Sequence, residues 1–168
     1  MRVIKLTETS LIVTWLTSSH GVIKTVAKGA RRPKSPFKGK LDLFYQSEIC
    51  WTQAKSSELH TLREVASLNF RSTIRSSYAN TELASYFCTL LERLIEPGMP
   101  AEGFLELLDR GLNYLGGSPA NLKALHHFER ETCKLLGIFT NERSAKSLLL
   151  SVLHGLPTNR ERCISMLD

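Results

Sequence analysis

The chain has 168 residues, 42% hydrophobic and 23% charged, with a formal net charge of +6. These values are typical of a globular protein large enough to bury a core in one or two domains. No apolar run approaches the roughly 20 residues that span a bilayer, and the first residues turn polar too early for a signal-peptide core. We therefore expect a cytoplasmic protein with no membrane partner.

The positive charge is confined to the first part of the chain. Residues 1–70 carry 11 basic and 5 acidic side chains, whereas residues 71–168 carry 11 of each. Seven basic residues and no acidic residue lie between Lys24 and Lys40. Because clustered like charge is self-repulsive, we expect a polyanionic partner. The alternative is a solvated loop whose lysines only keep the protein soluble.

The first 70 residues have the pattern of five short strands joined tightly. In the fourth predicted strand, residues 41–51, apolar and polar residues alternate, and this alternation places Phe44 on an otherwise polar strand face. Because closure removes exposed sheet edges, this pattern favours a small closed barrel, and the five-stranded OB-fold is the natural candidate. The predicted strands are 2–6, 10–17, 22–28, 41–51 and 59–68.

From about residue 72 the hydrophobic period becomes 3.6, which indicates helices. Pro97-Gly98, Gly116-Gly117 and Gly137 end successive helices. Pro100 and Ser118-Pro119 are suitable helix starts. Two shorter helices follow at 145–153 and 160–167. The predicted fold class is α+β: an OB-fold barrel over residues 1–70, then an all-α domain over residues 71–168.

The basic residues and nearby aromatic rings form a candidate site for nucleic acid. Cations that follow phosphates, together with rings on which bases stack, are the ingredients of sequence-tolerant single-strand binding. Phe37 has an alternative role in fixing the loop to the barrel, and a helix of the second half could cover Phe44. The predicted nucleic-acid-binding residues are Lys24, Lys28, Arg31, Arg32, Lys34, Phe37, Lys38, Lys40 and Phe44.

Catalytic and metal-binding patterns are missing from the sequence. The five acids of the first half are scattered, and no paired carboxylates, nucleophile motif or phosphate-binding glycine loop occurs. None of the four cysteines forms a C-x-x-C pair. His126 and His127 are interpreted as surface residues, and 129–131 as a solvated helix face. We expect no enzyme activity, no cofactor, no metal and no small-molecule substrate.

Several stretches resemble the RecO family, the bacterial recombination mediators of the RecF pathway. They are residues 8–17 (ETSLIVTWLT), His20-Gly21, residues 27–39 (AKGARRPKSPFKG) and residues 41–44 (LDLF). The resemblance is good over residues 1 to about 70 and weaker to the Leu-Gly helix end at Leu136-Gly137. It implies an N-terminal OB-fold, a helical C-terminal domain, and a DNA-contact role for Lys28, Arg31, Arg32, Lys34 and Lys38.

The same resemblance implies a function. RecO proteins bind single- and double-stranded DNA, anneal complementary strands, and contact RecR and the tail of single-strand-binding protein, which helps to load RecA. This chain is expected to do so in the cytoplasm, at the nucleoid. Many family members insert a four-cysteine zinc module after the Leu-Gly end, where this chain has residues 138–143 without cysteine. We therefore expect a short variant without zinc.

Two other functions remain open. In the first, the chain is a protein–protein adaptor of the recombination machinery with weakened DNA binding. In the second, it is an RNA-binding OB-fold protein, which would discriminate at the 2′-hydroxyl. A pull-down in which partner binding survives nuclease treatment would favour the adaptor over a DNA-binding protein. Competition between DNA and RNA of one sequence would distinguish an RNA-binding protein from a DNA-binding one.

Overall fold

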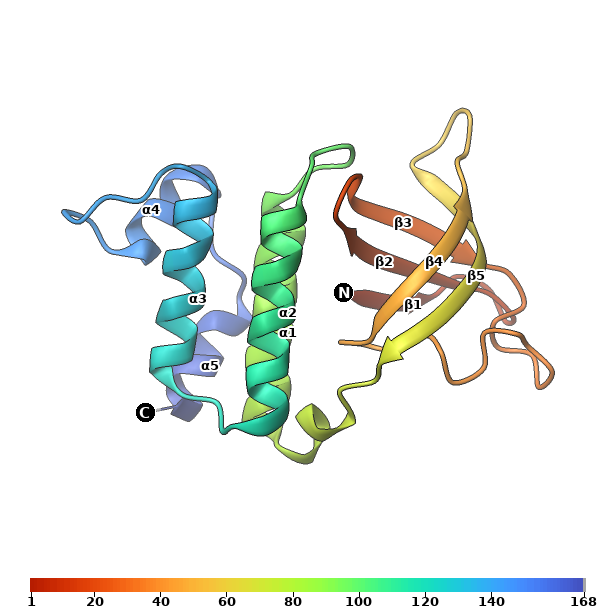
Figure 1. The fold of residues 1–168 in the computed structure, drawn as a ribbon, viewed down its shortest axis with the longest axis horizontal. Helices are drawn as coiled ribbons and strands as arrows, with labels where there is room; N and C mark the ends of the chain where they lie inside the picture. The colour runs from red at the N-terminus through yellow and green to blue at the C-terminus, as the bar shows by residue number, and fades with distance from the viewer. Residues whose placement is uncertain (168) are drawn as a thin grey trace.

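The computed structural model describes residues 1–167, and it has a five-stranded sheet followed by five α-helices (Figure 1). The predicted α+β class, with an OB-fold barrel before a helical part, is confirmed. The hydrogen-bonded strand order is β1-β2-β3-β5-β4. The strands are β1 (Arg2–Lys5), β2 (Leu11–Thr17), β3 (Gly21–Ala27), β4 (Gln46–Thr52) and β5 (Leu59–Asn69).

The β2–β3 hairpin forms the first half of the barrel. Its antiparallel register runs from Leu11 opposite Ala27 to Thr17 opposite Gly21, as the turn at His20-Gly21 predicts. Gly21 has a φ of 63°, and a Cβ there would lie 2.2 Å from the carbonyl oxygen of Glu96. Only glycine fits, because the backbone turns in the left-handed region against a neighbouring loop.

The second half of the barrel is β5, which pairs parallel to β3 and antiparallel to β4. Within residues 1–167 no backbone ladder joins β1 to β4. The expected full closure is therefore wrong, and the barrel is partly open at this seam, as OB-folds often are.

The fourth strand begins later than its alternation predicts. It starts at Gln46, and residues 41–45 form a turn in which Phe44 has a φ of 68°. Three arginine contacts hold this turn: Arg71 Nη1 donates to the Phe44 carbonyl at 2.7 Å, and Arg75 donates to Asp42 Oδ2 and to the Leu43 carbonyl. Side chains from the helical half therefore override the local strand pattern.

The helices follow the predicted segments, but two begin later than predicted, and the second helix starts at Glu102 and not at Pro100. The third helix begins at Leu122, not at Ser118-Pro119, because the side chain of Asn121 accepts the backbone N–H of Ala124 as its cap. The helical elements are the 3₁₀ turn η1 (Ser72–Ser76) and helices α1 (Tyr78–Leu94), α2 (Glu102–Gly117), α3 (Leu122–Leu135), α4 (Ala145–Val152) and α5 (Asn159–Leu167). None of them, within residues 1–167, is long and apolar enough to cross a membrane.

The molecule has three layers, with α1 and α2 between the barrel and helices α3–α5 (Figure 1). One hydrophobic core fills the barrel around Val13, Leu62 and Val65. A larger core lies among the helices and reaches Val22 and Phe44 of the barrel. The loop between α1 and α2 also hydrogen-bonds the β2–β3 hairpin, at 2.8 Å to His20 and 2.7 Å to Ser18. Shared packing and hydrogen bonds thus join the barrel to the first helical layer.

Candidate nucleic-acid interface

The seven basic residues of 24–40, here called the basic segment, surround the long connection between β3 and β4. Lys24 lies on β3, Lys28 follows directly after that strand, and Lys40 lies in a turn and not at the start of β4. All seven side chains are exposed. The connection itself is a series of turns, in which backbone N–H groups of residues 32, 35, 38 and 40 each bond the carbonyl three residues earlier. The sequence of turns displays the cations on one continuous piece of chain.

Most of these cations have no protein partner. Arg31 donates to the Glu8 carbonyl at 3.0 Å and lies 4.0 Å from its carboxylate. The other six side chains make no hydrogen bond or ion pair within the described part of the chain: Lys24, Lys28, Arg32, Lys34, Lys38 and Lys40. Elsewhere several arginines are paired, for example Arg2 with Glu92 at 2.7 Å. The basic segment therefore presents charge that the fold itself does not neutralise.

Neither aromatic residue predicted to stack on bases is accessible. Phe37 is 7% exposed and packs in the barrel core, which is the alternative role of fixing the loop. Phe44 is 4% exposed and packs in the core shared with the helices. The reason is the turn at 41–45, which rotates Phe44 inward from the strand face predicted for it. The base-stacking role is thus corrected for both rings.

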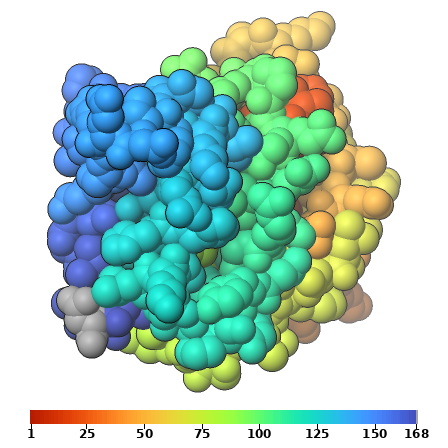
Figure 2. All heavy atoms as spheres, turned by 60° about the vertical axis from the view of Figure 1, so that its left-hand side comes forward, coloured from red at the N-terminus to blue at the C-terminus, as the bar shows by residue number. Residues whose placement is uncertain are grey.

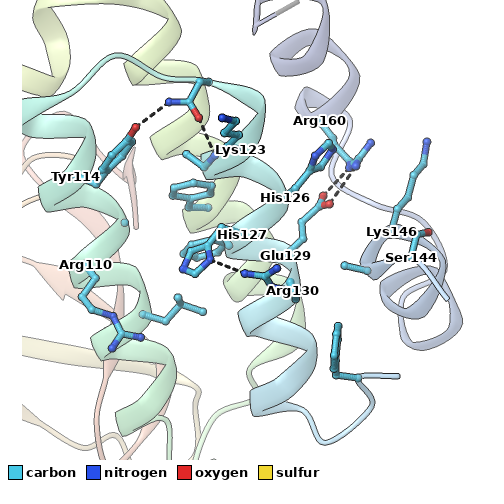
Figure 3. Close-up of a pocket in the computed structure, with 18 residues that line it drawn as sticks. Arg110, Tyr114, Lys123, His126, His127, Glu129, Arg130, Ser144, Lys146 and Arg160 are labelled. Carbon is cyan, nitrogen blue, oxygen red and sulfur yellow. Dashed lines mark hydrogen bonds and ion pairs between the residues drawn. The ribbon is translucent and has the colours of Figure 1, made fainter. Parts of the chain in front are cut away.

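A second candidate site, which the sequence did not indicate, follows α3 in the helical part. It is a cavity of about 1120 Å³ with α2 on one side of α3 and α4 and α5 on the other (Figure 3). Figure 2 shows this face, where the surface of α3 (teal) adjoins that of α2 (green). Its apolar wall includes Phe87 and Phe128, whose rings stack at 3.9 Å between centroids. Five cations line it: Arg110, Lys123, Arg130, Lys146 and Arg160.

Among residues 1–167, the one carboxylate that lines this cavity is already used inside the protein. Glu129 is 1% exposed and accepts from Arg160 Nε at 2.6 Å and from the Tyr86 hydroxyl at 2.5 Å. Burial and the nearby Glu129 carboxylate raise the pKa of Tyr86, which therefore stays a donor. Although burial acts in the opposite direction, the bonds to Glu129 raise the pKa of Arg160. The predicted solvated face at 129–131 is therefore wrong for Glu129.

The histidines, cysteines and acidic residues of the described part of the chain do not gather into a metal site. Among residues 1–167 no group of three or more histidine, cysteine or acidic side chains is placed to hold a metal ion. Cys88, Cys133 and Cys163 are buried, and Cys50 is exposed. Adjacent His126 and His127 are exposed on α3 and line the cavity, His127 within 3.1 Å of Arg130.

The chain thus combines a five-stranded barrel, whose long connection carries mostly unpaired cations, with helices that line a cationic cavity. Residues 1–71 match the family "Recombination protein O N terminal". The chain is 32% identical over 138 residues to the DNA repair protein RecO of Rhodopirellula baltica, which covers 82% of this chain and 51% of that protein. It is 27% identical to RecO of Syntrophus aciditrophicus, in a match that covers 82% of this chain and 53% of that protein. It is 29% identical to RecO of Moorella thermoacetica, in a match that covers 78% of this chain and 48% of that protein.

These matches place the chain in the RecO family of DNA repair proteins. The relation extends beyond the barrel, because the matched part covers about four fifths of this chain. The chain spans about half the length of the curated relatives that it matches.

Proposed function

We propose that the chain is a non-enzymatic recombination mediator that binds single- and double-stranded DNA, promotes strand annealing and supports RecA loading at the bacterial nucleoid. The observation that carries the proposal is the basic segment, with six exposed cations that have no partner within residues 1–167. Phosphate contacts by lysine and arginine supply most sequence-independent affinity for DNA. Charge neutralisation also lowers the repulsion between two phosphate chains, so annealing needs no nucleotide hydrolysis.

Removing three cations of the basic segment is expected to weaken DNA binding and to flatten its salt dependence. The variant Arg32→Ala/Lys34→Ala/Lys38→Ala removes side chains that bond nothing else in the described chain. If each cation neutralises one phosphate, the slope of log K against log salt on single strands becomes shallower by about 2. Fluorescence anisotropy with a labelled oligonucleotide between 50 and 200 mM salt measures both quantities.

The matched control removes the same charge from the helical half. Arg110→Ala/Lys123→Ala/Arg143→Ala changes three exposed cations far along the chain from the basic segment. Its slope should stay close to that of the wild type. An equal loss in both variants would mean that net charge alone attracts DNA, and an unchanged slope in the first variant would refute the assignment. Competition with RNA of the same sequence separates DNA from RNA binding.

The cavity along α3 supports a protein partner in addition to DNA. Its apolar wall and cationic lining suit an acidic peptide with a hydrophobic end, because Glu129 is neutralised internally. Resemblance to RecO proteins suggests the tail of single-strand-binding protein as this peptide, and RecR as a further partner. This cavity is also what favours the second candidate function, an adaptor in which protein contacts dominate.

Charge reversal at the cavity is expected to weaken peptide binding and to spare DNA binding. Arg110→Glu/Lys123→Glu alters two exposed side chains that make no hydrogen bond or ion pair in the part of the chain described. Isothermal titration with the C-terminal peptide of single-strand-binding protein should show at least a tenfold loss of affinity. Lys55→Glu, on the barrel, is the control. Equal peptide affinity in all three proteins would exclude the cavity as the peptide site.

A further inference from the structure

An aromatic pair, in which Phe70 is exposed and Tyr45 is half-buried, lies where the barrel meets the helices. Phe70, directly after β5, is 49% exposed, and its ring is 5.0 Å from that of Tyr45 in an edge-to-face arrangement. Arg75 of η1 places its guanidinium 5.8 Å from the centre of the Tyr45 ring. Leu68, two residues before Phe70, is also exposed. The fold gains little from leaving two large apolar side chains, Leu68 and Phe70, in water beside the Tyr45 ring, so a partner for them is the natural expectation.

Contacts between two arginines that follow β5 and the turn before Tyr45 hold the pair in place. Arg75 donates to Asp42 Oδ2 at 2.7 Å and to the Leu43 carbonyl at 3.2 Å. The buried guanidinium of Arg71 fixes the next carbonyl, that of Phe44, at 2.7 Å. Tyr45 therefore follows a turn that is anchored at three successive residues. Rings fixed in this way lose little conformational entropy when a flat ligand packs on them.

The position of the pair along the chain indicates the ligand. Tyr45 lies five residues after Lys40, the last cation of the basic segment, and residues 41–44 form the short turn between them. A strand of nucleic acid whose phosphates contact Lys38 and Lys40 would reach the ring of Tyr45 within a few nucleotides. Arg75 beside the ring is already paired with Asp42, so the free positive charge that precedes the pair along the chain is that of the basic segment. This unneutralised charge favours a polyanion over an apolar peptide.

We propose that Tyr45 and Phe70 form a stacking platform for the bases of single-stranded DNA bound by the basic segment. This inference rests on the proposed function, because it needs the phosphates of the same strand to lie on the basic segment. It assigns the aromatic role that Phe37 and Phe44 cannot perform from the core. Since every base has a π-face, such a platform is sequence-tolerant. In duplex DNA the bases are already stacked on one another, so the platform acts on single strands alone.

The test compares Phe70→Ala with the wild type on a labelled oligo(dT) and on a duplex of the same length. Phe70→Ala should lower the single-strand affinity about tenfold, leave the duplex affinity unchanged, and keep the salt slope, because no phosphate contact is lost. Phe70→Trp should restore the single-strand affinity. Tyr114→Ala is the matched control, an exposed ring on α2 whose removal should change neither affinity.

The outcomes separate this inference from the function on which it rests. If the wild type binds DNA with a steep salt slope and Phe70→Ala binds single strands equally well, the platform is refuted and the basic segment stands. An equal loss on single strand and duplex also refutes it, since stacking cannot act on paired bases. Wild-type protein that binds neither DNA would overturn the proposed function itself. Thermal melts by circular dichroism check that each variant is folded.

Discussion

Glu129→Gln is expected to lower the free energy of unfolding by about 3 kcal/mol, because the buried guanidinium of Arg160 loses its buried counter-charge and keeps only the exposed Glu161, 3.4 Å from Nη1. Glu129 and Arg160 are 1% and 3% exposed, and two bonds join them, at 2.6 Å to Nε and 3.1 Å to Nη2. They link α3 to α5, and Tyr86 of α1 donates to the same carboxylate. Glutamine keeps the side-chain volume, so the loss reports charge and hydrogen bonding. Urea unfolding followed by circular dichroism measures it.

Two further variants test the physical reason. Glu131→Gln, two residues along α3, breaks an exposed pair with Lys134 and should cost less than about 1 kcal/mol. Replacing both partners, as Glu129→Gln/Arg160→Met, removes the unpaired charge and should be more stable than Glu129→Gln alone. A double variant that is the least stable of the series would show that packing around Arg160, and not its charge, holds α5 in place.

Glu129 also shows where sequence interpretation could have done better. It begins a run of three charged residues with Arg130 and Glu131, and this run suggested a solvated face. Its spacing indicates a buried position instead. Positions 125, 129 and 133 share one face of a helix, and Leu125 and Cys133 on that face are apolar. A carboxylate in the middle of an apolar stripe predicts a buried partner. The identity of that partner, Arg160, comes from tertiary packing alone.

The aromatic residues mark the limit of sequence patterns at this site. Alternation places Phe44 on a strand face, and nothing local signals its left-handed backbone or the arginines that hold the turn. Tyr45 and Phe70 are 25 residues apart, and only the ends of β4 and β5 bring their rings together. The strands, the helices and the basic segment depend on local periodicity and composition, which is why they could be predicted. Contacts between residues far apart in the sequence, such as that of Tyr45 with Phe70, could not be predicted in this way.

Arg71 is the residue that joins the two halves most directly. It lies between β5 and η1, is 8% exposed, and has a left-handed backbone with a φ of 43°. Burial lowers its pKa, an effect that the nearby Asp109 opposes. Its guanidinium donates to Asp109 and to Asn113 of α2, and to the Phe44 carbonyl of the barrel. A planar fork with several donors can serve all three acceptors, and a lysine ammonium at the same place cannot.

Arg71→Ala is therefore expected to cost about 3 kcal/mol of unfolding free energy, with Arg71→Lys only slightly less damaging, because the buried Phe44 carbonyl and Asp109 lose their donors. Arg71→Gly removes the same side chain but relaxes the left-handed backbone, so it should be about 1 kcal/mol more stable than Arg71→Ala. Urea denaturation ranks the three variants. Near wild-type stability in Arg71→Ala would show that the hydrophobic core at Phe44 alone holds barrel and helices together. If the three variants rank in stability as expected, the guanidinium of Arg71 holds the barrel to the helices. The same guanidinium then also anchors the turn before Tyr45.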